Sequence, residues 1–291
     1  MHVAVLGAGT MGHGIAQVSA MAGHSVALRD VEDDLVDAGL ASIRDNLDGG
    51  IERGKVTEAE RDATLDRIEG VTDLGVAVAD ADLVIEAIPE VMDLKQSTFT
   101  DVEASAPEEA VLASNTSSLS VTEIASALDR PGRAVGLHFF NPPHIMGLVE
   151  VVLAEQTTEE TRHFAEDYVR GIGKTPITVE DSPGFATSRL GVAFGAEAVR
   201  MLQTGVASAR DIDRAMELGY NHPMGPIELT DIVGLDVRLD VLEYLRSELG
   251  ERFRPPQLLR RKVRAGKLGR KTGEGFYRWE NGEIIDEDGT E

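Results

Sequence analysis

Cysteine is absent from this 291-residue chain, which excludes disulfides, thiolate nucleophiles and zinc–thiolate sites. Long apolar runs are missing as well, and no stretch is long enough to cross a bilayer as a helix. Residues 1–7 enter an apolar run without a basic region before it, so we expect no signal peptide. Together these absences favour a cytoplasmic protein with no membrane partner.

Positive charge is scarce: 28 Lys and Arg residues stand against 51 Asp and Glu residues, and the formal net charge is −23. Such a surface repels nucleic acids and anionic membranes, so we expect neither as a partner. Repulsion of this size calls for strong screening, which leads to the hypothesis of a halophilic source with a salt-rich cytoplasm. The alternative is that the charge serves solubility alone.

Many of the basic residues are concentrated in residues 252–271, a stretch without any acid that we name the basic segment. Three interpretations stay open. The segment fits a surface that receives phosphates, a contact with an acidic face of another subunit, or a helix that is ion-paired to its own domain. Its nine basic residues are Arg252, Arg254, Arg260, Arg261, Lys262, Arg264, Lys267, Arg270 and Lys271.

A glycine-rich turn between a strand and a helix is the first motif that points to a ligand. Residues 2–6 have the apolar pattern of a buried strand, and residues 11–22 repeat apolar side chains at helical spacing. Between them Gly7 permits a tight turn, Gly9 lets the backbone approach a pyrophosphate, and Gly12 allows close helix–strand packing. A glycine triplet alone is a weak signal, but this context predicts dinucleotide binding at the helix N-terminus.

An acidic residue after the next strand completes this motif. Residues 25–29 are predicted to form the second strand, and Asp30 follows it directly. A carboxylate at this position hydrogen-bonds the adenosine ribose and repels a 2′-phosphate, so the sequence favours NAD over NADP. The neighbouring Arg29 keeps NADP open as an alternative.

The alternation of strands and helices continues beyond this motif. We therefore expect an α/β fold with a Rossmann-type, doubly wound and mostly parallel sheet over residues 1–183. Pro183 and Gly184 break the chain, and residues 184–291 have a helical pattern that predicts a second, all-α domain. Further apolar strands are predicted at residues 83–85, 110–113, 134–137 and 148–152.

One insertion departs from a minimal fold of this kind. Residues 31–69 are strongly polar and predict a helical hairpin broken near Gly54. Its apolar stripe is narrow, so we expect the hairpin to protrude from the domain and to cover a ligand. The stripe consists of Val36, Leu40, Ile43, Leu47 and Ile51.

The most informative stretch is residues 136–150. It places His138 after a short apolar run and Glu150 inside another, with Pro142 and Pro143 forcing a turn between them. An imidazole beside a buried carboxylate is a working general acid and base, because the carboxylate fixes the tautomer and stabilises the imidazolium. An adjacent antiparallel strand is expected to bring the two side chains together. Taken alone, this stretch fits a structural histidine near a strand end better.

Small polar side chains follow the predicted strand at residues 110–113. Ligands bind at the C-terminal ends of parallel strands, where Asn115 and Ser117 offer an amide and a hydroxyl to a carbonyl or a carboxamide. The alternative is an ordinary loop or helix cap.

Eight segments together resemble the L-3-hydroxyacyl-CoA dehydrogenase family, which includes 3-hydroxybutyryl-CoA dehydrogenases. They occur in family order across nearly the whole chain, so the match is far more specific than a shared nucleotide-binding fold. The segments are GAGTMGHGIA at residues 7–16, VIEAIPE at 84–90, SNTSSLS at 114–120, HFFNPP at 138–143, LVE at 148–150, DSPGF at 181–185, HPMGP at 222–226 and GRKTGEGFY at 269–277.

The resemblance implies the activity and the assembly. An L-3-hydroxyacyl-CoA is oxidised reversibly to the 3-oxoacyl-CoA with NAD as the cofactor and without a metal. The active site lies in a cleft between the two domains, and the C-terminal helical domain forms a homodimer. The basic segment then offsets the acidic field, so that anionic NAD and acyl-CoA can approach.

The resemblance also implies residue roles at matching positions. His138 takes the 3-hydroxyl proton, Glu150 orients His138, and Ser117 hydrogen-bonds the substrate oxygen. His144 lies outside the matched histidine position and is expected to be a loop residue. Besides the three glycines and Asp30, the cofactor-contacting positions are Thr10, Met11, Glu90, Lys95, Asn115 and Lys271. Besides Ser117, the substrate-binding positions are Asn141 and, for coenzyme A, Asn46 and Arg53.

One residue departs from the family pattern. Ser188 stands where the family usually has an Asn that helps to hold the substrate oxygen. Three alternatives stay open: the shorter side chain donates its hydroxyl directly to the substrate oxygen, it reaches that oxygen through a bridging water, or the acyl group binds in a different position. Two other functions stay open: oxidation of a free hydroxy acid, as in gulonate dehydrogenase-like relatives, and NAD binding without catalysis.

Overall fold

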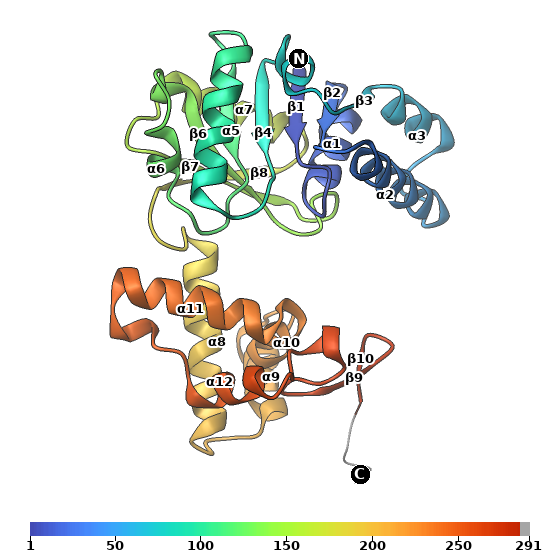
Figure 1. Ribbon diagram of the computed structural model, residues 1–291. Helices are drawn as coiled ribbons and strands as arrows, with labels where there is room; N and C mark the ends of the chain where they lie inside the picture. Colours follow the sequence, from blue (N-terminus) through green and yellow to red (C-terminus); the bar gives the residue numbers. More distant parts are fainter. Residues whose placement is uncertain (286–291) are drawn as a thin grey trace. The chain divides into compact units, whose positions relative to one another are not determined.

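The computed structural model describes residues 1–285. The chain folds into two compact units, one spanning Met1–Ser182 and one that begins at Pro183 (Figure 1). The first unit is a layered α/β structure and the second is mainly helical. No helix in this part of the chain is both long and apolar enough to cross a membrane.

An eight-stranded sheet forms the centre of the first unit, in the order β3-β2-β1-β4-β5-β6-β7-β8. The chain runs outward from β1 to β3 and then returns to the other side of β1, which is the topology of a dinucleotide-binding fold. β1 to β6 are parallel, whereas β7 pairs antiparallel with β6 and parallel with β8. The strands are β1 (His2–Leu6), β2 (Ser25–Arg29), β3 (Ile68–Val71), β4 (Leu83–Glu86), β5 (Val111–Ser114), β6 (Ala134–Phe139), β7 (Leu148–Leu153) and β8 (Thr175–Glu180).

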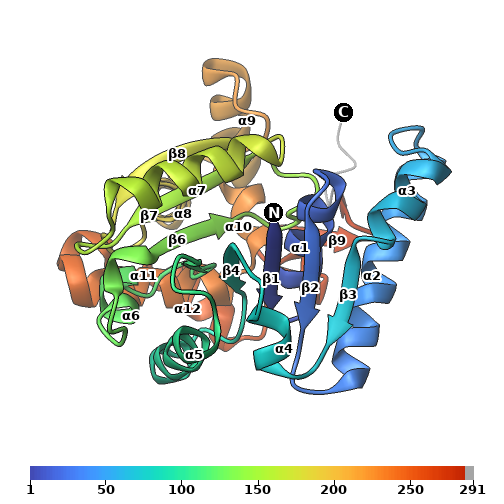
Figure 2. The same cartoon turned by 90° about the horizontal axis from the view of Figure 1, so that it is seen from above.

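Helices cover both faces of this sheet (Figure 2). α1 (Gly12–Met21) and α7 (Glu159–Gly171) lie on one face, where the hydroxyls of Ser19 and Tyr168 are hydrogen-bonded at 2.7 Å. The other face carries α4 (Leu74–Val78), α5 (Met92–Ser105) and α6 (Val121–Ala125), and the short 3-10 helix η1 (Pro131–Arg133) leads into β6.

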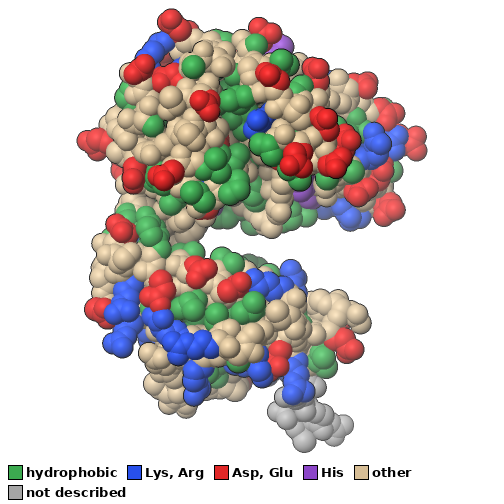
Figure 3. Space-filling view, viewed as in Figure 1, with side chains coloured by type: hydrophobic (Ala, Val, Ile, Leu, Met, Phe, Trp, Pro, Cys, Tyr) green, Lys and Arg blue, Asp and Glu red, His purple; other side chains and the backbone are tan. Residues whose placement is uncertain are grey.

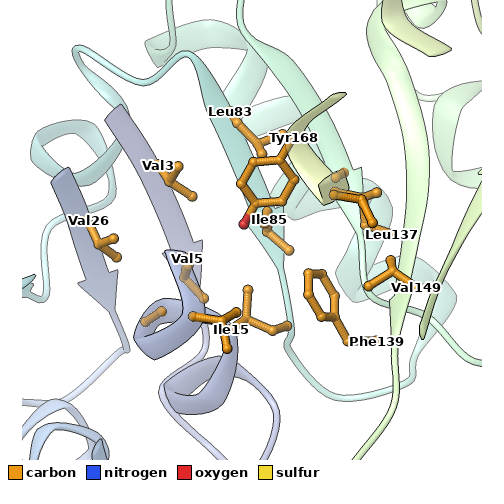
Figure 4. Packing of buried hydrophobic residues seen from close by; sticks show 14 of the residues in the cluster. Val3, Val5, Ile15, Val26, Leu83, Ile85, Leu137, Phe139, Val149 and Tyr168 are labelled. Carbon is orange, nitrogen blue, oxygen red and sulfur yellow. The ribbon is translucent and has the colours of Figure 1, made fainter. Parts of the chain in front are cut away.

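Burial of apolar side chains between the sheet and the α1/α7 layer holds this unit together. Strand residues such as Val5 and Ile85 pack against Ile15 of α1 and Tyr168 of α7 (Figure 4). These side chains are almost completely buried, and each contributes about 1.5–3 kcal/mol relative to its exposed state. The core therefore fixes β1 and α1, and with them the glycine turn that joins the two.

The helical hairpin consists of α2 (Asp33–Glu52) and α3 (Glu58–Leu65), joined by a turn in which Gly54 has a φ of +65°. The hairpin lies beside β3 at one end of the sheet (Figure 2). Within its stripe, Ile43 and Leu47 are completely buried in the main core. The stripe thus anchors α2 against α1, while the opposite face of α2 is exposed.

Two strands of this sheet were not anticipated from the sequence. β3 closes the stretch that was predicted as part of the hairpin, and β8 follows α7. Their patterns are weak because both strands are only partly buried. Thr178 of β8 donates to Glu166 of α7 at 2.7 Å. Together with the guanidinium groups of Arg162 and Arg170, this hydrogen bond lowers the pKa of Glu166 to about 2.

The second unit packs its helices around a separate apolar core. Residues such as Val192, Ile227 and Leu242 are buried in it. Lys and Arg side chains gather on this unit, whereas Asp and Glu side chains are dispersed over the first (Figure 3). The helices are α8 (Thr187–Gln203), α9 (Ala209–Tyr220), α10 (Pro226–Val233), α11 (Leu235–Leu249) and α12 (Gln257–Arg264), with the 3-10 helices η2 (Glu251–Phe253) and η3 (Arg270–Thr272).

A short antiparallel ribbon that the sequence did not predict follows these helices, formed by β9 (Arg278–Glu280) and β10 (Glu283–Ile285). Asp231 of α10 is completely buried and accepts hydrogen bonds from the backbone of Phe276 and Tyr277 and from the indole of Trp279. These bonds fix residues 276–279 against α10.

Candidate active site

Several polar segments converge at one edge of the sheet in the first unit. The glycine turn follows β1, Asp30 follows β2, and the loop that contains Glu90 follows β4. The loop that contains Ser117 follows β5, and His138 lies near the end of β6. Because these strands are parallel, their carboxyl ends share one edge, which is where ligands bind in such sheets.

The glycine turn has the shape that a dinucleotide requires. Gly7 has a φ of +100°, and an added Cβ would lie 2.6 Å from the carbonyl oxygen of Ala87. A Cβ on Gly12 would lie 1.6 Å from the carbonyl oxygen of Gly7, so only glycine lets α1 begin this close to β1. A Cβ on Gly9 would meet nothing within 4 Å, which leaves room for a pyrophosphate against the backbone at the start of α1.

Asp30 is tied directly to this turn. Its Oδ2 accepts the backbone N–H of Ala8 at 2.7 Å, and its Oδ1 accepts that of Val31 at 2.7 Å. The carboxylate is held at the end of β2, where a ribose of NAD would lie. The guanidinium of Arg29 donates from Nε to the carbonyl of Thr72 at 3.0 Å, so it is engaged at the end of β3.

His138 and Glu150 form a buried pair. They lie directly opposite each other in the register of β6 and β7, as the sequence predicted for an adjacent antiparallel strand. Nδ1 of His138 lies 2.6 Å from Oε2 of Glu150. His138 is 7% exposed, whereas Glu150 is 0% exposed. A carboxylate in this position accepts the Nδ1–H and leaves Nε2 as the nitrogen that exchanges a proton with a substrate.

The loop after β5 is organised by Glu90. Oε1 of this carboxylate accepts the hydroxyl of Thr116 at 2.6 Å and the backbone N–H of Ser117 at 2.9 Å. The hydroxyl of Ser117 lies 3.4 Å from the same oxygen, and Ser117 is exposed. Asn115 accepts the backbone N–H of Phe139 through its side-chain oxygen at 2.9 Å, which fastens this loop to the strand of His138.

Glu90 also takes part in a buried ion-pair network. Lys95 is completely buried and lies 2.6 Å from Glu86 and 3.2 Å from Glu90. Burial alone would raise the pKa of Glu90, but the Lys95 charge and the hydrogen bonds from Thr116 and Ser117 outweigh it and lower the net pKa. Lys95 has no exposed surface and holds Glu90, so its predicted contact with the cofactor stays a prediction.

The loop between the catalytic candidates is clamped by a lysine. Lys174 donates from Nζ to the carbonyl oxygens of Pro143 and Met146, both at 2.6 Å. His144 lies in this loop, as predicted, and burial followed by the nearby charges of His13, Arg53 and Lys174 lowers its pKa. Asn141 is exposed at the start of the same loop.

The predicted coenzyme A positions lie on α2 and just after it. Asn46 donates to the side-chain oxygen of Gln17 on α1 at 3.1 Å, so its amide is partly engaged within the protein. Arg53 is exposed at the C-terminal end of α2. The hairpin therefore presents one amide beside Gln17 of α1 and one cation at the C-terminal end of α2.

The second unit carries the two remaining predicted positions. Ser188 lies in the first turn of α8 and is half-buried. Lys271 forms an ion pair of 2.6 Å with Asp236 in the first turn of α11. The predicted cleft between the two domains stays a prediction.

Part of the basic segment is paired within its own unit. Arg260 pairs with Glu243 and Lys267 pairs with Glu274, which supports the interpretation of a helix ion-paired to its own domain. Arg261 and Arg264 form no ion pair with the residues that the structure describes. These two cations keep the phosphate-receiving interpretation open for part of the segment.

Sequence reasoning missed two of the charged residues that shape this site. Glu86 accepts the hydroxyl of Ser114 at 2.7 Å and the backbone N–H of Ile88 at 2.8 Å, in addition to pairing with Lys95. An acid inside an otherwise apolar strand was the available signal for it. Lys174 gave no comparable signal, because its partners are backbone carbonyls. Across residues 1–285 no group of three or more His, Cys, Asp and Glu residues could hold a metal ion.

Comparison with known proteins agrees with this geometry. Residues 2–182 match the family model of the 3-hydroxyacyl-CoA dehydrogenase NAD binding domain, and residues 184–279 match that of the 3-hydroxyacyl-CoA dehydrogenase C-terminal domain. The chain therefore contains an NAD-binding domain, and the three glycines and Asp30 fit that cofactor.

Similar proteins are found in several bacteria. A probable 3-hydroxybutyryl-CoA dehydrogenase of Deinococcus radiodurans is 43% identical over 96% of this chain and 100% of its own length. One from Bacillus subtilis is 44% identical over 96% of this chain and 97% of its own length. The crystal structure of (S)-3-hydroxybutyryl-CoA dehydrogenase from Ralstonia eutropha matches with a TM-score of 0.93 and 42% identity, covering 96% of this chain and 99% of that one. With both halves of the fold matched in order, this chain belongs to the 3-hydroxyacyl-CoA dehydrogenase family.

Proposed function

We propose that this protein catalyses the reversible, NAD-dependent oxidation of an L-3-hydroxyacyl-CoA to the 3-oxoacyl-CoA. The observation that carries the proposal is the buried His138–Glu150 pair, 2.6 Å apart, at the edge of the sheet that also holds the glycine turn. The names of the relatives from Deinococcus radiodurans and Bacillus subtilis support the same substrate class.

In this proposal His138 is the general base. Its Nε2 takes the proton of the 3-hydroxyl group while the carbonyl forms at C3, and the imidazolium that results is stabilised by Glu150. NAD held at the glycine turn would supply the acceptor for the hydride that leaves C3. In the reverse direction His138 returns the proton to the carbonyl oxygen. Both steps need the Nδ1–H to stay on the Glu150 side, which is what their 2.6 Å contact favours.

Ser117 is proposed to donate a hydrogen bond to the same substrate oxygen. Glu90 supports this role, because it accepts the backbone N–H of Ser117 and fixes the loop. A hydrogen bond that strengthens as charge develops on the oxygen lowers the barrier.

The cofactor is proposed to be held by residues from several loops. The backbone of residues 7–12, including Thr10 and Met11, receives the pyrophosphate, and Asp30 receives the adenosine ribose. Glu90, Asn115 and Lys271 are proposed to contact the rest of the cofactor, with Lys95 acting through Glu90. For the substrate, Asn141 and Ser188 are proposed near the acyl group, and Asn46 and Arg53 near coenzyme A.

We also propose that the second unit forms a homodimer through the domain proposed for residues 184–291. Large apolar side chains on α8 to α10 and between them are exposed, Leu218 to 84% and Tyr220 to 75%. A monomer rarely leaves so many apolar residues uncovered on neighbouring helices. Light scattering should give twice the mass of the chain, and the double variant Leu218→Glu/Tyr220→Glu should give the monomer mass.

The environment proposed for the protein is a cytoplasm rich in salt. This proposal is supported by the net charge of −23, because a high salt concentration screens the repulsion between the many acidic side chains. The cationic Arg261 and Arg264 are proposed to lower the local negative field, so that anionic substrates approach the second unit.

The His138→Gln variant tests the proposed function. Reduction of acetoacetyl-CoA with NADH, followed by the loss of NADH absorbance, should fall by about 10³-fold or more, because no group is left to transfer the proton. NADH affinity, measured by fluorescence titration, should stay near that of the unchanged protein. Full turnover in the variant, or turnover of a free 3-hydroxy acid but no acyl-CoA by the unchanged protein, would contradict the proposal.

A further inference from the structure

Arg238 in the first turn of α11 is an unusual cation in this protein. Its side chain is half-buried, and burial lowers its pKa with no opposing contribution from a nearby carboxylate. Its Nε is buried and has no hydrogen-bond partner among residues 1–285, and no carboxylate in that range forms an ion pair with it. A buried polar atom of a cation that makes no hydrogen bond is costly, so its retention needs an explanation.

The surface of α8 is shaped to receive this side chain. A Cβ on Gly191 would lie 3.4 Å from Nη1 of Arg238, and a Cβ on Gly195 would lie 3.0 Å from the hydroxyl of Thr230. Both glycines sit inside a helix, where glycine costs about 1 kcal/mol relative to alanine. The absence of side chains at these two positions makes room for the neighbouring helices, and at Gly191 for the guanidinium.

Ser188 lies on the same face of α8 as these glycines. Positions 188, 191 and 195 are spaced by three and four residues, so they line up along one side of a helix. Arg238 thus reaches α8 one turn beyond the serine that replaces the family's asparagine. On the other side of the same first turn of α11, Asp236 holds Lys271, a proposed cofactor-contacting residue.

We propose that Arg238 is a substrate-binding residue that supplies the hydrogen bond that Ser188 is too short to make. A guanidinium offers five N–H donors on a long side chain, so it reaches an acyl oxygen from a neighbouring helix. The occupant is a carbonyl oxygen of the 3-oxoacyl thioester, whose partial negative charge provides the missing partner. The guanidinium stays protonated throughout and transfers nothing.

This inference rests on the proposed function, and its test uses the full chain with acetoacetyl-CoA and NADH. Arg238→Ala and Arg238→Met should each lower kcat/KM by about 10- to 100-fold, the range for a lost hydrogen bond from a charged donor. NADH affinity and the melting temperature should change little. Arg246→Ala is the matched control: Arg246 lies on the same helix, pairs with Glu251, and should leave turnover unchanged.

Rescue separates substrate binding from a structural role. Introducing Ser188→Asn into the Arg238→Ala protein should recover at least about tenfold of the lost kcat/KM, whereas the same change in the unaltered protein should have a small effect. Unchanged turnover in Arg238→Ala, loss without rescue, or unfolding of both Arg238 variants would overturn the inference. If the unaltered protein reduces acetoacetyl-CoA, any such failure leaves the proposed function intact. An inactive unaltered protein contradicts both.

Discussion

The Glu150→Gln variant tests the central pair most directly. The substitution keeps the shape of the side chain but removes the charge that faces Nδ1 of His138 across 2.6 Å. A buried hydrogen bond with a charged partner contributes about 1.5–3 kcal/mol, and each 1.36 kcal/mol corresponds to a tenfold change in rate. If this whole contribution stabilises the transition state in which the imidazolium forms, kcat should fall by about 10- to 150-fold.

The amide adds a second effect in the same direction. It can present its oxygen to the Nδ1–H, or it can present its NH2 group to a bare Nδ1. The second arrangement places the ring proton on Nε2. This nitrogen must be unprotonated to accept the proton of the substrate hydroxyl. The loss should therefore appear in kcat, while the KM for acetoacetyl-CoA changes by less than about threefold.

The stability of the Glu150→Gln protein should change much less than its kcat. The buried carboxylate already bears a desolvation cost, so replacing it by a neutral isostere should shift the free energy of unfolding by about 1 kcal/mol or less. Initial rates of NADH oxidation and urea denaturation on the same samples give both numbers, with Glu155→Gln, an exposed change just beyond β7, as the control. A Glu150→Gln protein that keeps kcat within threefold of the original would refute the assigned role.

Three further outcomes are expected. Gly12→Ala should destabilise the fold and abolish NADH binding, because its Cβ would collide with the Gly7 carbonyl, whereas Gly9→Ala should fold normally and bind NADH more weakly; equal stability of the two variants argues against this turn geometry. Glu166→Gln should cost about 1–2 kcal/mol at pH 7, after discounting for the exposed arginines. The Glu166 carboxylate has a lowered pKa of about 2, so its contribution to stability is present above about pH 4.5 and lost as the pH falls through 2. Urea denaturation should show the difference in the free energy of unfolding between the original protein and the variant shrinking over this range. A difference that persists at pH 2 rejects this cause. Finally, the melting temperature should rise as KCl is raised from 0.1 M to about 2 M, since the Debye length shrinks from about 10 Å to a few ångströms; a flat response disagrees with screening of the net charge.

The substitution of the family asparagine gains a physical context from the second unit. Ser188, Gly191 and Gly195 share one face of α8, and Arg238 lies against that face. Sequence reasoning treated Ser188 alone, as a shortened side chain. The role proposed for Arg238 adds a longer donor on α11, one helical turn from Ser188 along that face.

Burial explains which predictions came from the sequence and which did not. The strands of the parallel core were readable because both faces are covered, which makes them continuous apolar runs, as in β1 and β4. β3 and β8 lie at the two edges of the sheet, are only partly buried, and carry no such run. The β9–β10 ribbon is short, and its position depends on Asp231 rather than on its own pattern.

The sequence by itself determined the dinucleotide turn, the class of fold and the pairing of His138 with Glu150. These depend on local rules: glycine where a Cβ collides, apolar runs where a strand is buried, and a double proline that reverses the chain. Only the tertiary structure decided that Lys95 is enclosed between Glu86 and Glu90, and that Arg238 is a half-buried cation whose Nε has no partner in the described residues. A side chain's charge is written in the sequence, but its partners come from segments that meet only when the chain has folded.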